Sequence, residues 1–496
     1  MKKNLEQLLL LIPDASITGE RNKIIKAVTH DSRNVVPGTL FICLTGNKVD
    51  GHEYIQQAVE LGAVAVLVEK QIAVPAGIIV IQVENTRTAM QLIVPAFFDY
   101  PARELRMIGV TGTNGKTTTT YLVRSILKAA GFKTGVIGTI QTLIEDRVLP
   151  VKNTTPDVVE LQRTLAEMVD ADIDYVIMEV SSHALALDRV AGCEFDIGAF
   201  TNITQDHLDF HGTFDRYTDA KAKLFRLLGQ EGNIKQGKAA VINLDDGAGK
   251  VMLENTSCRA ITYSIHTSAD IMAKDIEVFA TGSSFCVTYW QGEIPLKLKI
   301  TGVFNVYNVM AAVGVALAEG IESTVIQKAL EQFESVPGRF ELVDAGQSFT
   351  VIVDYAHTPD GLENILKTAK QFAKQRIIAV FGCGGDRDRT KRPIMGKIAA
   401  EMADVVIATS DNPRSEDPDV ILTEIEAGIK EGLTPNKQYE KIVDRRQAIV
   451  RALSIAQAED VVIIAGKGHE TYQILKDRTI SFDDKQIAIE ILEEMK

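Results

Sequence analysis

The residues best suited to chemistry lie in a glycine-rich segment, Gly109–Thr117, with the sequence Gly-Val-Thr-Gly-Thr-Asn-Gly-Lys-Thr. Its inner glycines would let the backbone turn its N–H groups inward around an anion. Lys116 would bring a full positive charge to the terminal phosphates of a nucleotide, and Thr117 a hydroxyl ligand for Mg²⁺. The usual phosphate-loop spacing is not met, because Val110 stands where the first glycine is expected. An apolar run before the segment and a helix-like run after it still predict a nucleotide site.

A second group of candidate residues contains a carboxylate and two histidines. Glu179 follows the apolar run 175–178, and a carboxylate at the end of a buried strand is costly unless it meets a cation. We expect Mg²⁺ there, with a buried arginine as the alternative partner. His207 and His211 have a spacing that suits zinc on a helix, but Gly212 and nearby aspartates indicate a loop. His207 is therefore a candidate ligand for a second Mg²⁺, and His211 is expected to be structural.

The elements that must position these residues follow an α/β pattern, in which short β-branched runs alternate with helix-length amphipathic segments. We expect three domains: a smaller N-terminal α/β domain (1–102), a central P-loop-type ATPase domain with a mostly parallel sheet (103–336), and a Rossmann-like C-terminal domain (337–496). The expected C-terminal strands run directly into polar or glycine-rich loops: Thr350–Tyr355, Arg376–Phe381, Val405–Thr409 and Val461–Ala465. Because ligands bind beyond the carboxyl ends of parallel strands, these loops are predicted to line a site.

The composition argues against several classes of protein. The 496 residues carry a formal net charge of −13, whereas nucleic-acid-binding proteins usually present a basic face. Five scattered cysteines predict neither disulfides nor a zinc site and favour a reducing cytoplasm. No apolar run is long enough to cross a membrane, and Leu8–Ile12 is too short for an export signal. We therefore expect a cytoplasmic protein whose first helix is buried.

Motifs along nearly the whole chain resemble those of the Mur ligase family, the amide-forming enzymes of peptidoglycan precursor synthesis. The family's form of the phosphate loop is TGTNGKT, which accounts for Val110. The other matching motifs are Asn153–Pro156, Glu179–His183, Asp206–Gly212, Gly302–Asn305 with Asn308, Gly338–Glu341, Asp354–His357 and Gly466–Glu470. The resemblance implies a ligase that uses ATP and Mg²⁺ and acts on small molecules, and we expect it to be a monomer.

The resemblance also implies roles for individual residues. Lys221, which would face solvent by default, matches the lysine that the family carbamylates, and a carbamate can hold Mg²⁺ where an ammonium would repel it. The implied catalytic residues are Lys116, Glu179, His207 and Lys221. The implied metal ligands are Thr117, Glu179, His207 and Lys221 as a carbamate. The implied nucleotide-binding residues are Thr111, Gly112, Thr113, Asn114, Gly115, Lys116, Thr117, Asn305, Asn308 and Arg339. The implied residues for a UDP-linked substrate are Ser32, Asn153, Thr154, Thr155, Ser181 and Arg189.

Within the family, the chain resembles members that add a diamino acid to UDP-N-acetylmuramoyl-L-alanyl-D-glutamate. The run Asp411-Asn412-Pro413-Arg414 is similar to the signature of those that use meso-diaminopimelate. This amino acid is lysine with one more carboxylate, which an arginine can bind through two parallel hydrogen bonds. Lysine would leave that guanidinium unpaired, at a cost in free energy. The resemblance completes the site with Arg387, Gly466 and Glu470, with Glu470 suited to the substrate's ammonium group.

Three alternatives stay open. The chain could perform the same ligation with L-lysine, be a ligase like folylpolyglutamate synthetase, or be a nucleotide-dependent binding protein without ligase activity. The second is disfavoured because the chain has an additional N-terminal domain with the motif Asp31-Ser32-Arg33. The third is disfavoured because Lys116, Glu179, His207 and Lys221 are all present.

Overall fold

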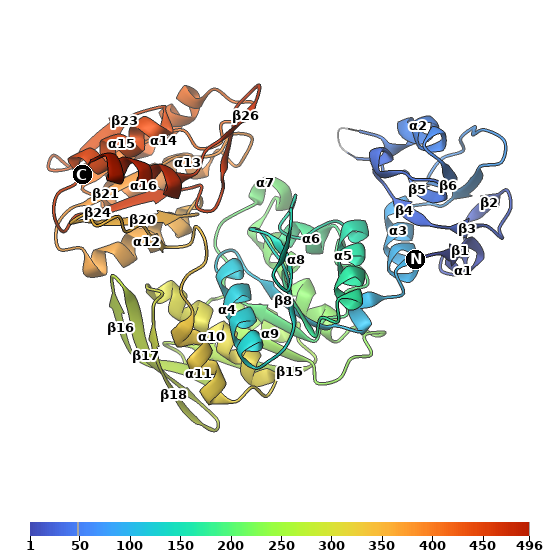
Figure 1. Cartoon of the computed structure of the whole chain (residues 1–496), viewed down its shortest axis with the longest axis horizontal. Coiled ribbons are helices and arrows are strands. Elements are labelled where there is room, and N and C mark those ends of the chain that lie inside the picture. Colours follow the sequence, from blue (N-terminus) through green and yellow to red (C-terminus); the bar gives the residue numbers. More distant parts are fainter. Residues whose placement is uncertain (47–48, 496) are drawn as a thin grey trace. The chain divides into compact units, whose positions relative to one another are not determined.

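The computed structural model describes residues 1–46 and 49–495 and shows an α/β protein with three large sheets (Figure 1). Backbone contacts divide the chain into two compact units. Unit 1 comprises Met1–Gly109, Phe132–Gly198 and Lys223–Ala239, and unit 2 comprises Val110–Gly131, Ala199–Ala222 and Ala240–Lys496. The three-domain α/β architecture predicted from the sequence is confirmed. The domain boundaries at residues 102 and 336 stay a prediction.

The N-terminal part of unit 1 contains a small sheet with helices on both faces. Its main elements are α1 (Leu5–Leu9), β2 (Ser16–Thr18), β4 (Ala27–Thr29), β5 (Thr39–Ile42), α2 (Ile55–Glu60), β6 (Ala63–Val68), β7 (Ile79–Gln82) and α3 (Thr86–Phe97). The strand order is β2-β7-β6-β5-β4, and all pairs except β2-β7 are parallel. Successive side chains of a strand point to opposite faces. Leu40 and Leu67 therefore pack with α1 and α3, whereas Phe41 and Val66 pack with α2.

The second sheet has eleven strands. The strand order is β11-β10-β9-β12-β8-β13-β14-β15-β16-β17-β18. The pairs β9-β12 and β15-β16 are parallel, and the ends of the sheet are antiparallel hairpins. The strands are β8 (Arg106–Thr111), β9 (Thr134–Ile137), β10 (Thr142–Ile144), β11 (Arg147–Leu149), β12 (Tyr175–Glu179), β13 (Ile197–Phe200), β14 (Ala239–Asn243), β15 (Arg259–Ser264), β16 (Ile271–Phe279), β17 (Gly282–Tyr289) and β18 (Gly292–Leu298).

Helices between and after these strands carry Lys116, Thr117, Lys221, Asn305 and Asn308, five of the residues that were predicted to bind a nucleotide or a metal. The helices are α4 (Lys116–Ala129), α5 (Val158–Asp170), α6 (Ser182–Ala186), α7 (Leu208–His211), α8 (Phe214–Leu228), α9 (Gly249–Glu254), α10 (Val303–Ala318) and α11 (Ser323–Gln332). In unit 2, α4 packs against α10 and α11. Most side chains of α10 are apolar and buried, including Val306, Val309 and Val313, so this helix lies in the interior of the unit.

The C-terminal sheet has six strands in the order β19-β20-β24-β21-β22-β23, and every pair except β19-β20 is parallel. Its strands are β19 (Glu341–Leu342), β20 (Thr350–Asp354), β21 (Ile377–Phe381), β22 (Val405–Ala408), β23 (Gln438–Lys441) and β24 (Val461–Ala465). The helices are α12 (Pro359–Phe372), α13 (Lys391–Met402), α14 (Pro418–Gly432), α15 (Arg445–Ile455) and α16 (Asp484–Glu494), and a hairpin of β25 (Tyr472–Ile474) and β26 (Thr479–Ser481) follows β24.

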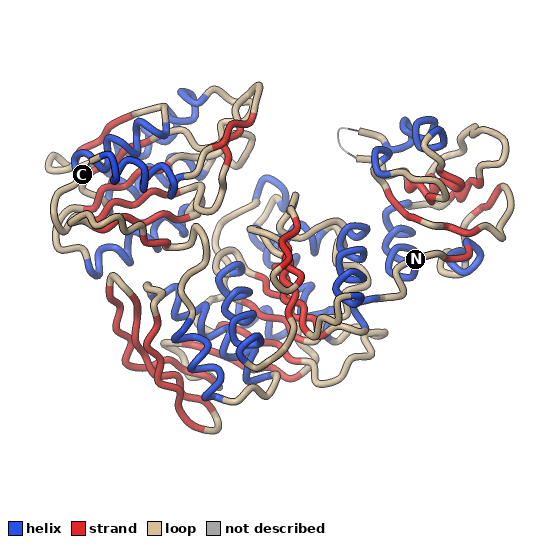
Figure 2. The backbone as a smooth tube through the Cα atoms, viewed as in Figure 1, coloured by secondary structure: helices blue, strands red, loops and turns tan. Residues whose placement is uncertain are grey.

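Helices cover both faces of this C-terminal sheet (Figure 2). Ile377, Ala379 and Phe381 of β21 pack with α12, α13 and α14, whereas Ile378 and Val380 pack with α15 and α16. A doubly wound parallel sheet of this kind places its loops for ligands beyond the carboxyl ends of its strands. Among the helices of the described residues, none is both long and apolar enough to span a membrane.

Candidate active site

The glycine-rich segment forms a tight loop between β8 and α4 in unit 2. Gly112 and Gly115 have φ angles of +153° and +84°, which residues other than glycine rarely adopt. A Cβ atom at Gly112 would lie 1.9 Å from Thr201 Oγ1, and one at Gly115 would lie 2.2 Å from Asn308 Oδ1. Lys116 folds back over the loop, and its Nζ donates to the carbonyl oxygens of Gly112 and Thr113 at 3.0 Å each. The loop thus has the backbone shape and the charge to hold phosphate.

Residues that were not predicted from the sequence brace this loop. Thr201 Oγ1 donates to the carbonyl oxygen of Asn114 at 2.6 Å, and Asn202 Oδ1 accepts from the Asn114 N–H at 2.9 Å. The hydroxyl groups of Thr113 and Tyr217 lie 3.0 Å apart. Thr201 and Asn202 directly follow β13, so their place at the end of a strand was the available signal.

Lys221 lies in the interior and not in solvent, where a lysine on a helix is expected by default. Lys221 lies on α8 and is only 1% exposed. Nζ donates to the carbonyl oxygen of Gly112 at 2.7 Å and lies 4.7 Å from the centre of the Tyr217 ring. Burial, followed by the positive charge of Lys116, lowers the pKa of Lys221 well below its ordinary value. The structure therefore places a lysine amine with a lowered pKa next to the phosphate loop.

A short helix, α7, lies where the sequence indicated a loop, and His211 is its last residue. His207 is the N-cap of α7, with a φ angle of +54°, and its Nε2 lies 3.3 Å from Asp206 Oδ2. Burial lowers the pKa of His207, although Asp206 opposes this effect. His211 is buried, and its ring centre lies 5.2 Å from that of Tyr217, a packing contact that agrees with a structural role.

These side chains suit Mg²⁺ better than a transition metal. No group of three or more His, Cys, Asp or Glu side chains within the described ranges could by itself hold a metal ion. Mg²⁺ typically binds through one or two protein oxygens, several waters and the phosphates of a substrate. A hydroxyl group at Thr117, in the first turn of α4 after the phosphate loop, fits that mode of binding.

Glu179 and three of the six residues predicted for the UDP-linked substrate form a hydrogen-bonded cluster in unit 1. Glu179 Oε1 accepts from the N–H of Thr139 at 2.8 Å, and Oε2 accepts from its hydroxyl at 3.0 Å. The Thr139 hydroxyl also lies 3.1 Å from that of Thr154. Thr155 Oγ1 donates to the Glu179 carbonyl oxygen at 2.8 Å and accepts from the Ser181 N–H at 3.0 Å. Thr139 therefore belongs to this cluster, although no motif had indicated it.

The remaining residues predicted for that substrate lie at the edge of the cluster or in the N-terminal part of unit 1. Arg189 Nη1 donates to the carbonyl oxygen of Thr155 at 3.4 Å, and burial lowers the pKa of Arg189. Asn153 is exposed. Ser32 is buried and donates to Gln57 Oε1 at 2.9 Å. In its motif, Arg33 lowers the pKa of Asp31 to about 2.

The predicted nucleotide residues outside the loop lie on α10 and after it. Asn308 Nδ2 donates to Asn305 Oδ1 at 3.0 Å, and both residues are buried. Arg339 Nη2 donates to Thr117 Oγ1 at 3.1 Å, and its guanidinium lies 4.4 Å from the centre of the Tyr355 ring. Asp354, at the end of β20, accepts from the Phe340 N–H at 2.6 Å and so fixes the backbone next to Arg339.

The residues predicted for the amino acid gather at the carboxyl ends of β21, β22 and β24. Arg414 is in the left-handed region, with a φ angle of +52°, and its Nη1 donates to the Gly385 carbonyl oxygen at 2.9 Å. Burial, followed by the charge of Arg387, lowers the pKa of Arg414. Within the described residues, no carboxylate lies within 4.0 Å of the Arg414 guanidinium. Two neighbouring arginines without such a partner could bind an anionic group.

The third loop of this site contains a buried lysine that was not singled out from the sequence. Lys467 is fully buried, and its Nζ donates to Glu470 Oε2 at 2.9 Å and to Asn412 Oδ1 at 3.2 Å. Glu470, expected to face the substrate's ammonium group, is therefore already paired with a cation. Asp411 Oδ2 is buried without a hydrogen-bond partner in the described part of the chain, and a Cβ atom at Gly466 would lie 2.6 Å from it.

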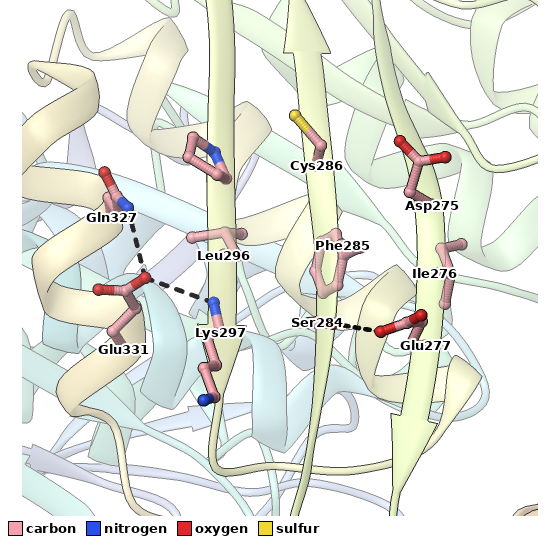
Figure 3. A pocket seen from close by; sticks show the side chains of 11 residues that line it. Asp275, Ile276, Glu277, Ser284, Phe285, Cys286, Leu296, Lys297, Gln327 and Glu331 are labelled. Carbon is pink, nitrogen blue, oxygen red and sulfur yellow. Dashed lines mark hydrogen bonds between the residues drawn. The ribbon is translucent and has the colours of Figure 1, made fainter.

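A separate pocket of about 670 Å³ lies between β16, β17, β18 and α11 (Figure 3). It is lined by 11 residues, including Asp275, Glu277 and Cys286. Glu331 Oε1 accepts from the Lys297 N–H at 3.4 Å in its wall. None of its 11 lining residues belongs to the sets predicted from the sequence, so we do not assign it to the candidate active site.

Known proteins match this chain over nearly its whole length. Residues 24–98 match the Mur ligase family catalytic domain, residues 110–316 the Mur ligase middle domain, and residues 338–468 the Mur ligase glutamate ligase domain. A UDP-N-acetylmuramoyl-L-alanyl-D-glutamate–2,6-diaminopimelate ligase of Geobacillus thermodenitrificans is 49% identical over 98% of each chain. A protein of the same name from Bacillus cereus is 46% identical over 98% of each chain. A solved structure with this name has a TM-score of 0.70 and 33% identity, covering 100% of this chain and 99% of the other.

Proposed function

Because the chain belongs to the Mur ligase family, we propose that it is an ATP-dependent ligase that joins meso-diaminopimelate to UDP-N-acetylmuramoyl-L-alanyl-D-glutamate. The observation that carries the choice of amino acid is the pair Arg387 and Arg414. Burial and the charge of Arg387 lower the pKa of Arg414. A second carboxylate on the substrate would offset both positive charges, whereas lysine would leave them unpaired.

In the proposed reaction, a side-chain carboxylate oxygen of the D-glutamyl residue attacks the γ-phosphorus of ATP, and ADP leaves. The amine of diaminopimelate then attacks the carbonyl carbon of the acyl phosphate, phosphate leaves, and the amine loses a proton. The Lys116 charge and the N–H groups of the Gly112–Gly115 loop stabilise the negative charge on the transferred phosphoryl group. No protein nucleophile is needed, so positioning and charge account for catalysis.

Mg²⁺ would neutralise charge on the phosphates and orient them when bound. We propose that Thr117, His207 and a carbamylated Lys221 are ligands of two Mg²⁺ ions, and Glu179 stays a predicted magnesium ligand. The buried setting of Lys221 supports carbamylation, because a neutral amine can attack CO₂ whereas an ammonium cannot. The Lys221→Ala variant should lose nearly all ligase activity and regain part of it with added short carboxylates such as formate. Full activity without them would refute the carbamate.

The deciding assay measures ADP release from ATP in the presence of the UDP-linked dipeptide, with meso-diaminopimelate or L-lysine offered separately. We expect release with diaminopimelate only. ADP release with L-lysine but not with diaminopimelate would favour the lysine-adding alternative. ADP release in a parallel reaction with folate substrates in place of these would favour the folylpolyglutamate-synthetase-like alternative. ATP binding without any ADP release would favour a binding protein.

A pair of variants tests the arginine directly. Arg414→Met should raise the KM for diaminopimelate on the order of a hundredfold, because one bidentate charge-assisted contact is lost. Arg446→Met is the matched control, since Arg446 is exposed and its Nη1 contacts Glu490 at 3.1 Å on helices α15 and α16. An unchanged KM in Arg414→Met would contradict the proposed role.

We further propose that the protein acts in the cytoplasm as a monomer and without nucleic acid. The five cysteines are all free, which supports a reducing compartment. The net charge of −13 supports the absence of a nucleic-acid partner. Light scattering at increasing protein concentrations tests the monomer, which a mass of twice 54.3 kDa would exclude.

A further inference from the structure

The two loops that carry Arg387 and Arg414 touch each other along their backbones. The Gly385 N–H donates to the Asn412 carbonyl oxygen at 2.9 Å, and Arg414 Nη1 donates back to the Gly385 carbonyl oxygen at 2.9 Å. A Cβ atom at Gly385 would lie 1.9 Å from the carbonyl oxygen of Pro413. The two loops therefore approach as closely as glycine permits, and a shift of one must be followed by the other.

A buried arginine from a third element joins these loops. Arg392, in the first turn of α13, has no exposed surface. Its Nη1 and Nη2 donate to the two carboxylate oxygens of Glu416 at 2.9 and 2.8 Å, and Nη2 also donates to the Gly384 carbonyl oxygen at 3.2 Å. Glu416 lies two residues after Arg414, and Gly384 lies three residues before Arg387. One guanidinium thus holds a point on each loop.

Glu416 extends the bridge to the backbone of the opposite loop. Its Oε1 accepts from the Asp386 N–H at 2.5 Å, in addition to Arg392. Asp386 in turn accepts from Ser415, through the hydroxyl at 2.6 Å and through the N–H at 3.2 Å. The neighbours of both arginines are therefore fixed by charge-assisted hydrogen bonds.

Burying the Arg392 guanidinium costs free energy, and a gain in stability does not account for its presence here. A guanidinium must lose its water to become fully buried, and buried ion pairs are often no more stabilising than apolar residues of similar size. The bridge also acts against repulsion between Arg387 and Arg414, whose like charges are brought together before any substrate is bound. Rigid placement of the two arginines is a function that fits this cost, because preorganised groups bind a ligand without having to be ordered first.

We infer that Arg392 and Glu416 are positioning residues that hold the Arg387 and Arg414 loops at the separation that suits the second carboxylate of a diamino dicarboxylic acid. The inference rests on the proposed function, since it concerns the amino-acid site of that ligase. Arg392 is fully buried and contacts both loops, so its loss should act through them on the binding of the amino acid only.

The test compares Arg392→Lys, Glu416→Gln and the control Arg451→Ala in the full-length protein. Lysine keeps the positive charge but cannot donate to both carboxylate oxygens and to Gly384 at once. We expect Arg392→Lys and Glu416→Gln to raise the KM for meso-diaminopimelate on the order of tenfold, with kcat and the KM for ATP within about twofold of the wild type. The preference for diaminopimelate over L-lysine should fall with it. Arg451 of α15 pairs with Glu440 of β23 at the surface without a contact to either loop, and Arg451→Ala should change none of these values.

Each outcome bears on the inference. A wild-type protein without ADP release would overturn the proposed function, whereas a wild type that prefers diaminopimelate leaves the bridge to be judged by its variants. Unchanged KM and preference in the variants would overturn the bridge. A fall in kcat and in unfolding temperature with the KM unchanged would also overturn it, because that pattern indicates a purely structural role. If Arg392→Lys does not fold, Glu416→Gln decides, since Glu416 is partly exposed and glutamine has nearly its shape.

Discussion

Replacing Lys221 by methionine should stabilise the protein while abolishing ligation. Methionine has a similar volume and flexibility but no charge, so it removes the cost of burying an amine that is 1% exposed. The carbonyl oxygen of Gly112 would not be left without a donor, because Lys116 Nζ also donates to it at 3.0 Å. Among the described residues, no carboxylate forms an ion pair with Lys221, so the substitution leaves no buried charge behind.

The pH dependence gives the magnitude. The pKa of Lys221 is lowered in the folded protein and returns to its ordinary value near 10.5 on unfolding. Between these two values the unfolded chain binds one more proton than the folded one, so the stability of the wild type rises with pH by about 1.4 kcal/mol per unit. The penalty is fully present below the lowered pKa and is gone above 10.5. The advantage of Lys221→Met should therefore shrink by about 1.4 kcal/mol for each pH unit in this window.

The assay is urea denaturation of both proteins at pH 8 and pH 9, without nucleotide and in buffers free of CO₂, so that the amine stays unmodified. Lys223→Met on the same helix is the control, since Lys223 is partly exposed and pairs with Asp188. Its difference from the wild type should stay within about 1 kcal/mol and should not change between these pH values. A Lys221→Met protein that is less stable than the wild type, or a difference that is independent of pH, would refute the reasoning.

Three further substitutions test other parts of the site. Gly115→Ala should weaken ATP binding at least about tenfold, because its Cβ would lie 2.2 Å from Asn308 Oδ1 at a φ angle of +84°; calorimetric titration with ATP measures this, and unchanged affinity would contradict it. Arg445→Met should lower the free energy of unfolding by about 3–5 kcal/mol, since it strands the fully buried Asp484, and adding Asp484→Leu should restore most of the loss in urea denaturation. Lys467→Met should raise the KM for diaminopimelate about tenfold by releasing Glu470 and Asn412, with the KM for ATP as the internal control; equal changes in both values would argue against this role.

The sequence predicted those parts of the site that depend on local pattern. The glycine-rich loop between a strand and a helix lies where the run of residues placed it, and the loops after β21, β22 and β24 converge as parallel strands require. The short helix at 208–211 was missed because a single turn leaves no periodic signal, and Gly212 indicated a loop.

Contacts between distant segments could not be predicted in the same way. Lys221 and Lys223 are both charged residues on one helix, and only the packing of α8 against a loop 109 residues earlier decides that the first is buried. Five of the six residues in Arg387–Arg392 are charged, a composition that is typical of an exposed turn. The burial of Arg392 depends on Glu416 and Glu424, which reach it from a different part of the chain.

The interlocked loops beyond β21 and β22 have a practical consequence for engineering. Their contacts run almost entirely between residues 384–392 and 412–424, all within one sheet and its helices in unit 2. A graft between relatives that exchanges both stretches together would carry its own complementary partners. Exchanging only one would leave the buried Arg392 guanidinium, or its replacement, without its own carboxylate partners. The preference for one amino acid should thus be transferred only when both stretches are exchanged together. A chimaera in which Arg414 alone is replaced should not acquire the preference of the relative, whereas the double graft should.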